Sequence, residues 1–240
     1  MADLERALLD WYALEGRDLP WRRTRDPYAI LVSEVMLQQT QVERIMPRYL
    51  HWLERWPTAE SLAAAPRSEV IREWQGLGYN RRAVNLHRAA ERIAEAGWPD
   101  DLTELPGVGR YTADAVARFA MEEEVLPLDV NVARVLERTG GRFGAASAQA
   151  LMDLGATVCL ARVPRCGACP LAGECPSRGR RYEPLRKQGR FEGSFRQLRA
   201  QTLRLVAERA RPAADLDREA VAALARDGLV RLDDGLVRLP

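Results

Sequence analysis

The stretch LPGVGRYTADAV at residues 105–116 decides the fold of this chain, because it joins a tight turn directly to the start of a helix. A proline and two glycines predict the turn, and the apolar spacing after them predicts the helix. Glycines let backbone N–H groups approach an anion closely, and a helix N-terminus adds partial positive charge. The unit therefore predicts a phosphate-binding turn made by Gly107, Val108 and Gly109. The alternative is a glycine-rich connector between helices that binds nothing.

Apolar residues recur at helical spacing on both sides of this turn. Hydrophobic residues make up 47% of the 240 residues, enough to bury a core without disulfides. Pro20, Pro27, Pro47 and Pro57 are expected to separate the first helices. The sequence thus predicts an all-α body over residues 1–176. The expected helices cover 3–16, parts of 28–56, 58–64, 67–75, 80–96, 101–104, 110–121, 130–138 and 146–160.

The chain changes character after this body. Residues 177–196 are rich in Arg and Gly, lack apolar periodicity and are interpreted as a basic linker. Two amphipathic helices are expected at 197–211 and 215–227, and the Asp-Gly pair between two copies of LVRL predicts a terminal hairpin. Residues 197–240 are therefore expected to form a small winged-helix-like module. Such modules bind DNA in some proteins and only pack against other domains in others, and the sequence favours neither use.

Positive and negative charges are nearly balanced in the chain. The formal net charge is +2, which is lower than in many nucleic-acid-binding proteins. No apolar run is long enough to span a bilayer, and the N-terminus has acidic residues where a signal peptide has basic ones. We therefore expect a cytoplasmic protein without membrane contact. Lys187 is the one lysine, since all other basic residues are arginines.

The four cysteines, Cys159, Cys166, Cys169 and Cys175, lie within one short segment with the spacing C-x6-C-x2-C-x5-C. Four thiolates this close in the sequence are typical of a metal site. Both a tetrahedral zinc ion and a [4Fe–4S] cluster are compatible with four cysteine ligands. Zinc ribbons usually pair two C-x2-C units, and this segment has a single one, which favours the cluster.

Two carboxylates stand out by their surroundings. Asp129 precedes an apolar helical run in LPLDVNVARVL at 126–136, which is the position of a helix N-cap. Glu34 lies among apolar residues in PYAILVSEVMLQQTQV at 27–42 and is expected to be buried. Burial raises the pKa of a carboxyl group, so Glu34 is suited to hold a proton near neutral pH. The alternative for Glu34 is a buried ion pair with an arginine.

Several segments together resemble the endonuclease III and MutY superfamily of DNA glycosylases, and the MutY adenine glycosylases in particular. The resemblance implies a two-lobed helix-hairpin-helix fold in which the cysteine spacing binds a [4Fe–4S] cluster. It also implies a monomeric, nucleoid-associated enzyme of base excision repair that binds double-stranded DNA with a mispaired or damaged base. The segments are 27–42, WQGLGYNRRAVNLHRAA at 74–90, 105–116, 126–136 and 151–175, which begins LMDLGATVC.

The resemblance implies catalytic roles for four residues. Glu34 would protonate the purine near N7, to make the base a better leaving group. Asp129 would stabilise C1′ of an oxocarbenium-like transition state and the incoming water. Tyr111 and Asn131 would position these two carboxylates.

The resemblance also implies contacts with DNA bases. Tyr79, which follows the sequence G-L-G, would enter the base stack, and Gln38 and Gln39 would contact bases around the flipped nucleotide. The alternatives are an aromatic residue packed under a loop and a glutamine pair on a solvated helix edge.

Tyr111 occupies the position at which strand-cleaving relatives have a Schiff-base lysine, so lysine-dependent lyase activity is not expected. The expected reaction is excision of adenine opposite 8-oxoguanine or guanine. The alternatives are a mismatch thymine or uracil glycosylase, a catalytically impaired cluster-bearing DNA-binding protein, and a zinc-stabilised transcription factor. Two features depart from MutY: a shortened segment at 139–150, and a tail too short for the NUDIX-like domain that reads 8-oxoguanine.

Overall fold

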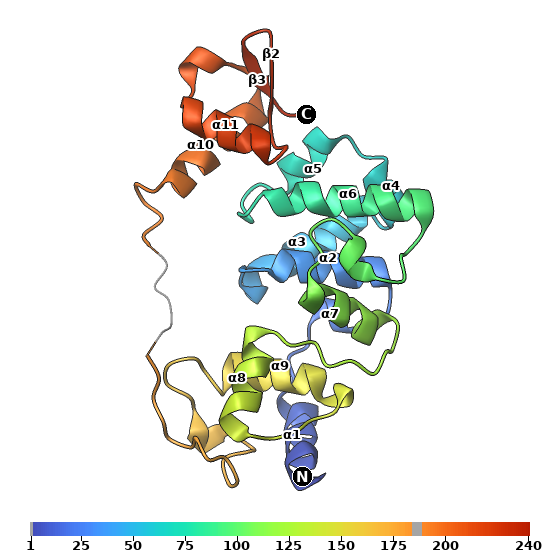
Figure 1. Cartoon of the computed structure of the whole chain (residues 1–240), viewed down its shortest axis with the longest axis vertical. Helices are drawn as coiled ribbons and strands as arrows, with labels where there is room; N and C mark the ends of the chain where they lie inside the picture. The colour runs from blue at the N-terminus through green and yellow to red at the C-terminus, as the bar shows by residue number, and fades with distance from the viewer. Residues whose placement is uncertain (1, 184–188) are drawn as a thin grey trace. The chain divides into compact units, whose positions relative to one another are not determined.

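The computed structural model describes residues 2–183 and 189–240, and the statements below concern those residues. Most of them are helical, which confirms the predicted all-α class (Figure 1). The contacts divide the chain into two units, each assembled from two separate stretches. The first unit is Met1–Pro27 with Arg110–Lys187, and the second is Tyr28–Gly109 with Gln188–Pro240.

These contact units do not follow the order of the predicted ranges 1–176, 177–196 and 197–240. The chain leaves the first unit after Pro27, builds most of the second, and returns to the first at residue 110. The predicted ranges describe segments along the chain and stay a prediction. None of the helices in the described residues is long and apolar enough to cross a bilayer.

The first unit is built around three helices that share one apolar core. Val132 and Val135 lie on one face of α8, as expected for an amphipathic helix, and pack with Leu8 of α1 and Leu154 of α9. Leu171, from the segment that contains the cysteines, completes this core. The elements are α1 (Ala2–Glu15), η1 (Pro20–Arg22), α7 (Arg110–Ala120), α8 (Val130–Thr139), η3 (Ala145–Ser147), α9 (Ala148–Thr157) and η4 (Cys166–Ala168).

A buried carboxylate joins the N-terminal stretch of the first unit to α9. Asp153 is fully buried and accepts hydrogen bonds from Arg17 Nη2 at 2.6 Å and from Arg22 Nη2 at 2.7 Å. Burial by itself raises the pKa of Asp153, but the hydrogen bonds from Arg22 and Arg17 outweigh it and lower the pKa. Asp153 therefore remains ionised and is paired with both guanidinium groups.

The second unit is organised around α2, in which every residue from Tyr28 to Met36 is buried. A helix that is apolar on all sides belongs in the middle of a core. The rings of Trp56 and Trp74 lie edge-on against Trp52 of α3. The elements around α2 (Pro27–Leu37) are α3 (Val42–Arg55), α4 (Ala59–Ala63), α5 (Arg67–Glu73), α6 (Arg81–Ala96) and η2 (Leu102–Glu104).

Pro47 does not separate two helices, so that expectation is wrong. It lies inside α3, where it removes one backbone donor. Ile45, Tyr49 and Trp52 are buried at helical spacing along the same helix. Packing of this apolar face stabilises α3 despite the missing hydrogen bond.

The C-terminal residues contain the two helices and the terminal hairpin expected from the sequence, and we call them the C-terminal module. Its three strands are antiparallel in the order β1-β3-β2, with Leu232 opposite Val237. The hairpin turns at Asp234 and Gly235, both with left-handed backbone (φ 49° and 74°), as the Asp-Gly signal predicts. The elements are α10 (Phe195–Glu208), β1 (Arg211–Pro212), η5 (Ala213–Asp215), α11 (Arg218–Arg226), β2 (Arg231–Asp233) and β3 (Leu236–Arg238).

This module is packed onto α5 and α6, as Figure 1 shows. Ile71 of α5 and Val84 of α6 belong to the same apolar cluster as Leu203 and Leu224 of the module. Arg72 Nε also donates to a backbone carbonyl of α10 at 3.0 Å. The module is therefore an integral part of the second unit.

Candidate active site and cysteine loop

Asp129 caps the N-terminus of α8 in the first unit. Its Oδ1 accepts hydrogen bonds from the backbone N–H groups of Asn131 and Val132, at 2.9 and 2.6 Å. Its Oδ2 accepts one from the side-chain amide of Asn131 at 2.8 Å. The N-cap interpretation is thus confirmed, and the Asn131 amide also donates to the Asp129 carboxylate.

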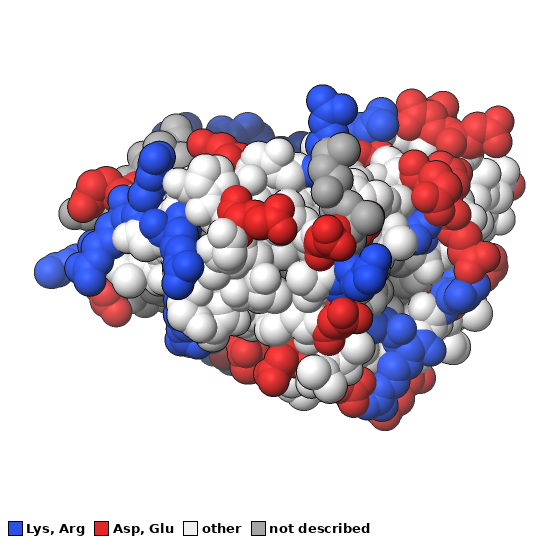
Figure 2. Space-filling view, turned by 90° about the horizontal axis from the view of Figure 1, so that it is seen from below, with Lys and Arg blue, Asp and Glu red and all other residues white. Residues whose placement is uncertain are grey.

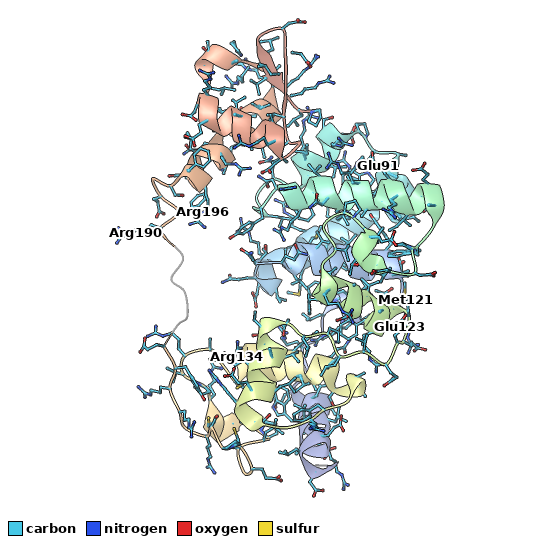
Figure 3. The ribbon with its side chains drawn as sticks, viewed as in Figure 1. Glu91, Met121, Glu123, Arg134, Arg190 and Arg196 are labelled. Carbon is cyan, nitrogen blue, oxygen red and sulfur yellow. The ribbon has the colours of Figure 1, made fainter. Side chains whose placement is uncertain are left out.

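A chain of hydrogen bonds continues from this carboxylate to the segment with the cysteines. Arg134 Nη2 donates to the side-chain oxygen of Asn131 and to Gly155 O, each at 2.7 Å, and its Nε donates to Cys159 O at 2.8 Å. Figure 3 shows Arg134 on the side of α8 next to that segment. Asp129 is therefore connected to the first cysteine through two side chains.

Close packing of two helices supports the same residues. A Cβ atom added to Gly155 of α9 would lie 2.6 Å from Cβ of Asn131. Such a distance is far shorter than ordinary contact between carbon atoms, so only glycine fits here. The segment LMDLGATVC and the segment with Asp129 meet at this point.

The four cysteines line one recess of the first unit, together with Val135, Arg138 and Leu154. Arg138 Nη1 donates to Leu160 O at 2.8 Å and to Cys159 Sγ at 3.5 Å. We call residues 159–175 the cysteine loop. Arg134 and Arg138 lie one helical turn apart on α8 and donate hydrogen bonds to the first residues of this loop.

Each of the four cysteines is partly buried. Among the described residues, no group of three His, Cys, Asp or Glu side chains is arranged to hold a single metal ion. Cys166 Sγ accepts a hydrogen bond from Gly179 N–H at 3.3 Å. Burial raises the pKa of the Cys169 thiol, and a hydrogen bond from the Leu171 backbone acts against it.

Basic side chains gather at the left end of the face in Figure 2, the side on which Figure 1 draws the cysteine loop. The exposed arginines of the loop and the residues after it are Arg162, Arg165, Arg178, Arg180 and Arg181. The nearly neutral net charge of the chain therefore hides a local excess of positive charge.

Glu34 lies on α2 in the second unit, one turn before the end of the helix. Glu34 is 6% exposed and lies among the buried residues of α2. The predicted burial of Glu34 is thus found. Lys187 lies outside the described residues, so the structure adds nothing to the prediction for that amine.

Two turns of the second unit contain Gln38, Gln39 and Tyr79. We call residues 38–40 the glutamine turn and residues 76–79 the tyrosine turn. Gln39 and Tyr79 both have left-handed backbone, with φ of 57° and 47°. This conformation costs a non-glycine residue about 1–3 kcal/mol and persists only where surrounding contacts impose it. Gln39 and the ring of Tyr79 are exposed, the latter at 45%.

Arg82, a residue that the sequence interpretation did not single out, contacts both turns. It is 8% exposed, and burial lowers its pKa to about 10, against a favourable interaction with Tyr79. Its guanidinium also lies over the rings of Trp74 and Tyr79. Its hydrogen bonds are to Val35 O (2.7 Å), Met36 O (2.9 Å), Gln38 O (2.8 Å), Thr40 Oγ1 (3.2 Å), Leu77 O (3.3 Å), Gly78 O (3.0 Å) and Tyr79 O (3.4 Å).

The predicted phosphate-binding turn ends the first stretch of the second unit. Gly107 has φ of 80°, and an added Cβ would lie 2.7 Å from Asn85 Cβ, so this position requires glycine. Val108 is buried and its N–H donates to Leu105 O at 3.0 Å. Gly109 is exposed, with nothing within 4 Å of an added Cβ. The turn therefore leaves its backbone accessible at Gly109.

The structure distributes the predicted site residues over the two units. Tyr111 lies at the start of α7 in the first unit, with Asp129, Asn131 and the cysteines. The second unit carries Glu34, both turns and the hairpin glycines.

A family model described as "HhH-GPD superfamily base excision DNA repair protein" matches residues 32–156, just over half of the chain. The chain belongs to this superfamily. The match confirms the superfamily predicted from the resemblance, and it spans both the helix with Glu34 and the helix that follows Asp129. The matched residues include the turn and helix start at residues 105–116.

Members of this superfamily that are named adenine DNA glycosylase are similar to the chain. The protein from Mycolicibacterium smegmatis is 43% identical over 237 aligned positions, which cover 85% of this chain and 80% of that protein. The human protein is 40% identical over 228 positions, which cover 78% of this chain and 42% of that protein. A solved thermostable thymine-DNA glycosylase is 28% identical with a TM-score of 0.64, over 71% of this chain and 93% of that one.

Sequence interpretation missed Arg82, Arg134 and Arg138, although one signal for Arg82 was present. Arg82 lies at helical spacing from Leu86 and Ala89, on the apolar face of α6. An arginine in an apolar stripe indicates a buried guanidinium with specific acceptors. No comparable pattern identified Arg134, because its acceptors come from another helix and from the cysteine loop.

Proposed function

We propose that the chain is an adenine DNA glycosylase of base excision repair. It hydrolyses the N-glycosidic bond of adenine mispaired with 8-oxoguanine or guanine in double-stranded DNA. The observation that carries this proposal is the 43% identity to a relative with that name, across 80% of the relative's length. The enzyme acts as a monomer in the cytoplasm, associated with the nucleoid.

In the proposed reaction Asp129 is the ionised group beside the sugar. Three N–H donors hold its two oxygens in place at the end of α8. A fixed negative charge stabilises the oxocarbenium character that develops at C1′ as the bond to the base breaks. Asp129 also orients the water that attacks C1′, and Tyr111 and Asn131 position the two carboxylates.

Glu34 is the proposed general acid. Glu34 is buried on α2, and a buried carboxyl group is suited to carry the proton for transfer. Protonation of adenine near N7 lets the base depart as a neutral molecule. Two carboxyl groups in different environments thereby take different roles, as in other glycosidic bond cleavage.

The proposed DNA contacts involve exposed parts of both units. The accessible backbone at Gly109 and the start of α7 bind a phosphate of the strand that holds the target base. Tyr79 occupies the space left by the flipped nucleotide, and Gln38 and Gln39 contact neighbouring bases. The exposed arginines of the cysteine loop add sequence-independent contacts with phosphates.

We propose a [4Fe–4S] cluster as the cofactor, held by Cys159, Cys166, Cys169 and Cys175. The four cysteines line one recess, and their spacing contains a single C-x2-C unit, whereas zinc ribbons usually pair two such units. When bound, the cluster cross-links the loop, while Arg134 and Arg138 connect the loop to α8.

Lysine-dependent strand cleavage is not part of the proposed reaction. The side chain at the relevant position of α7 is Tyr111, and a phenol forms no Schiff base. The enzyme is therefore monofunctional, and hydrolysis leaves an abasic site with an intact strand.

A single-turnover assay tests the substrate. Duplexes with A opposite 8-oxoguanine, A opposite G, T opposite G and U opposite G are incubated with excess enzyme, with and without alkali. We expect excision of adenine only, and strand breaks only after alkali. Excision of T or U without A would support the mismatch pyrimidine glycosylase instead, the second candidate that the similarity to thymine-DNA glycosylase suggests.

Elemental analysis tests the cofactor. Protein purified without oxygen is expected to be brown and to contain about four irons and four sulfides per chain. A stoichiometric zinc content without iron would contradict the cluster and leave the glycosylase proposal to the excision assay.

A further inference from the structure

The surroundings of Arg82 are unusual for a buried charge. Within the described residues no salt bridge includes Arg82, and its partners are backbone carbonyls and the Thr40 hydroxyl. A buried guanidinium loses its hydration, and here these dipoles and the rings of Trp74 and Tyr79 offset that loss. An apolar side chain would fill the same space without this cost, so packing alone does not explain the arginine.

Its acceptors lie at three places that the proposed site needs. Val35 O and Met36 O are at the C-terminus of α2, the helix that carries Glu34, where carbonyls lack helical partners and a positive charge is favourable. Gln38 O belongs to the glutamine turn. Gly78 O and Tyr79 O belong to the tyrosine turn.

The bound carbonyls lie beside the two strained residues. Gln38 O is in the peptide group that precedes Gln39, and Tyr79 O is in the peptide group that follows the left-handed Tyr79. Because each peptide plane adjoins a left-handed residue, fixing the carbonyl restricts the backbone angles of that residue. One planar group thereby restrains both turns at once.

We propose that Arg82 is a positioning residue that preorganises the glutamine turn and the tyrosine turn for base flipping. It keeps Gln39 and Tyr79 in the left-handed conformation before DNA binds, so that Tyr79 enters the base stack without first ordering its turn. Arg82 is buried and does not itself contact DNA. This inference rests on the proposed function, and the experiment separates the two.

Arg82→Lys is the principal test. A lysine keeps the charge, but its single ammonium group cannot reach acceptors in both turns and at the end of α2. Val84→Ala is the matched control, because Val84 lies on the same helix, is fully buried and faces the core shared with the C-terminal module. Thr40→Val is a milder variant that removes one acceptor of Arg82 Nη2 and keeps the buried charge.

Hydrogen exchange measures the effect on the turns without reference to activity. We expect Arg82→Lys to speed exchange of backbone amides at residues 38–40 and 77–80, with Thr40→Val producing a smaller change at the same residues. Val84→Ala is expected to affect the module and α6 instead. Unchanged exchange in both turns of folded Arg82→Lys would overturn the proposal.

Single-turnover excision and base unstacking measure the effect on function. With 2-aminopurine next to the target adenine, Arg82→Lys is expected to reduce the fluorescence rise on binding and to slow excision about 10- to 100-fold. Affinity for undamaged duplex is expected to stay within about threefold, because phosphate contacts are retained. Alkali is added before analysis, so that the new amine does not confuse the strand-break readout.

Equal excision rates for Arg82→Lys and Val84→Ala would overturn the role in positioning. If Arg82→Lys fails to fold, Thr40→Val decides: normal exchange in both turns and a normal excision rate would also overturn it. If the wild-type protein excises no base, the proposed function fails, and hydrogen exchange still tests whether Arg82 holds the two turns.

Discussion

Glu34 and Asp129 carry the same functional group in opposite surroundings. Glu34 lies one turn before the end of α2 and is buried, as is every residue of that helix from Tyr28 to Met36. Asp129 lies at the N-terminus of α8, partly exposed, with N–H donors on both oxygens. Burial in general disfavours a negative charge, whereas the N-terminus of a helix provides hydrogen bonds for one.

The comparison shows how two side chains of one kind come to lie in different environments, as their proposed roles of acid and ionised partner require. Helix position makes the difference: beyond the first turn of a helix the N–H groups are bonded within the helix, whereas the first turn offers several free N–H groups. The support also differs. The α2 end is held by Arg82, while the Asp129 cap is held by Asn131, Arg134 and close packing with α9.

Replacing the ionised member of the pair is expected to have the largest effect. Asp129→Asn should slow adenine excision at least about 10³-fold, because the negative charge beside the sugar is lost. The amide oxygen still caps α8, so the melting temperature and duplex affinity should change little. Single-turnover kinetics and fluorescence anisotropy provide the measurements. Loss of binding together with activity would instead mean that Asp129 is only a structural cap.

Asp153 lies on α9, the helix that packs against α8. Its replacement tests how far that packing depends on the ion pairs with Arg17 and Arg22. Asp153→Asn should lower the free energy of unfolding by about 3–5 kcal/mol at neutral pH, because Arg17 and Arg22 lose their counter-ion. The pKa of Asp153 is lowered in the folded protein, so its stabilisation is complete above the unfolded value of about 3.9.

The difference between wild type and Asp153→Asn should therefore shrink as the pH falls through the folded pKa, which lies below that value. Urea unfolding at a series of pH values measures it. A difference that is constant down to the most acidic pH would show that the ion pairs contribute nothing beyond packing.

Replacing the buried Glu34 by a residue without an acidic proton should have a smaller effect on excision. Glu34→Gln keeps the shape and leaves no acidic group, and we expect excision to slow about 10²-fold. The melting temperature should be retained or raised, since a neutral amide replaces a buried carboxyl group. Single-turnover excision from the 8-oxoguanine duplex tests this, and unchanged turnover would exclude Glu34 as the acid.

The packing behind Asn131 should give the smallest effect. Gly155→Ala places a methyl group against Asn131, and the shift it forces should cost about 1–3 kcal/mol of stability. Excision should slow with it, because Asn131 orients Asp129. Gly173→Ala is the control, since an added Cβ there meets no atom within 4 Å. Equal stability and rates for both variants would show that α8 adjusts freely.

Local signals in the sequence were enough to predict most of the secondary structure. The expected helix at 80–96 is Arg81–Ala96, the one at 130–138 is Val130–Thr139, and the Asp-Gly hairpin turns where expected. These features depend on apolar spacing, caps and turn residues that act over a few positions. The prediction that Pro47 separates two helices was wrong because burial of α3 outweighs the local effect of a proline.

The sequence alone determined the helical class, the N-cap at Asp129, the burial of Glu34 and the one short segment with all four cysteines. Only the tertiary structure decided that Arg82 joins two turns, that Arg134 connects Asn131 to the cysteine loop, and that the C-terminal module packs on α5 and α6. The reason is physical: spacing and capping act between near neighbours. The acceptors of a buried guanidinium come from segments that meet only after folding.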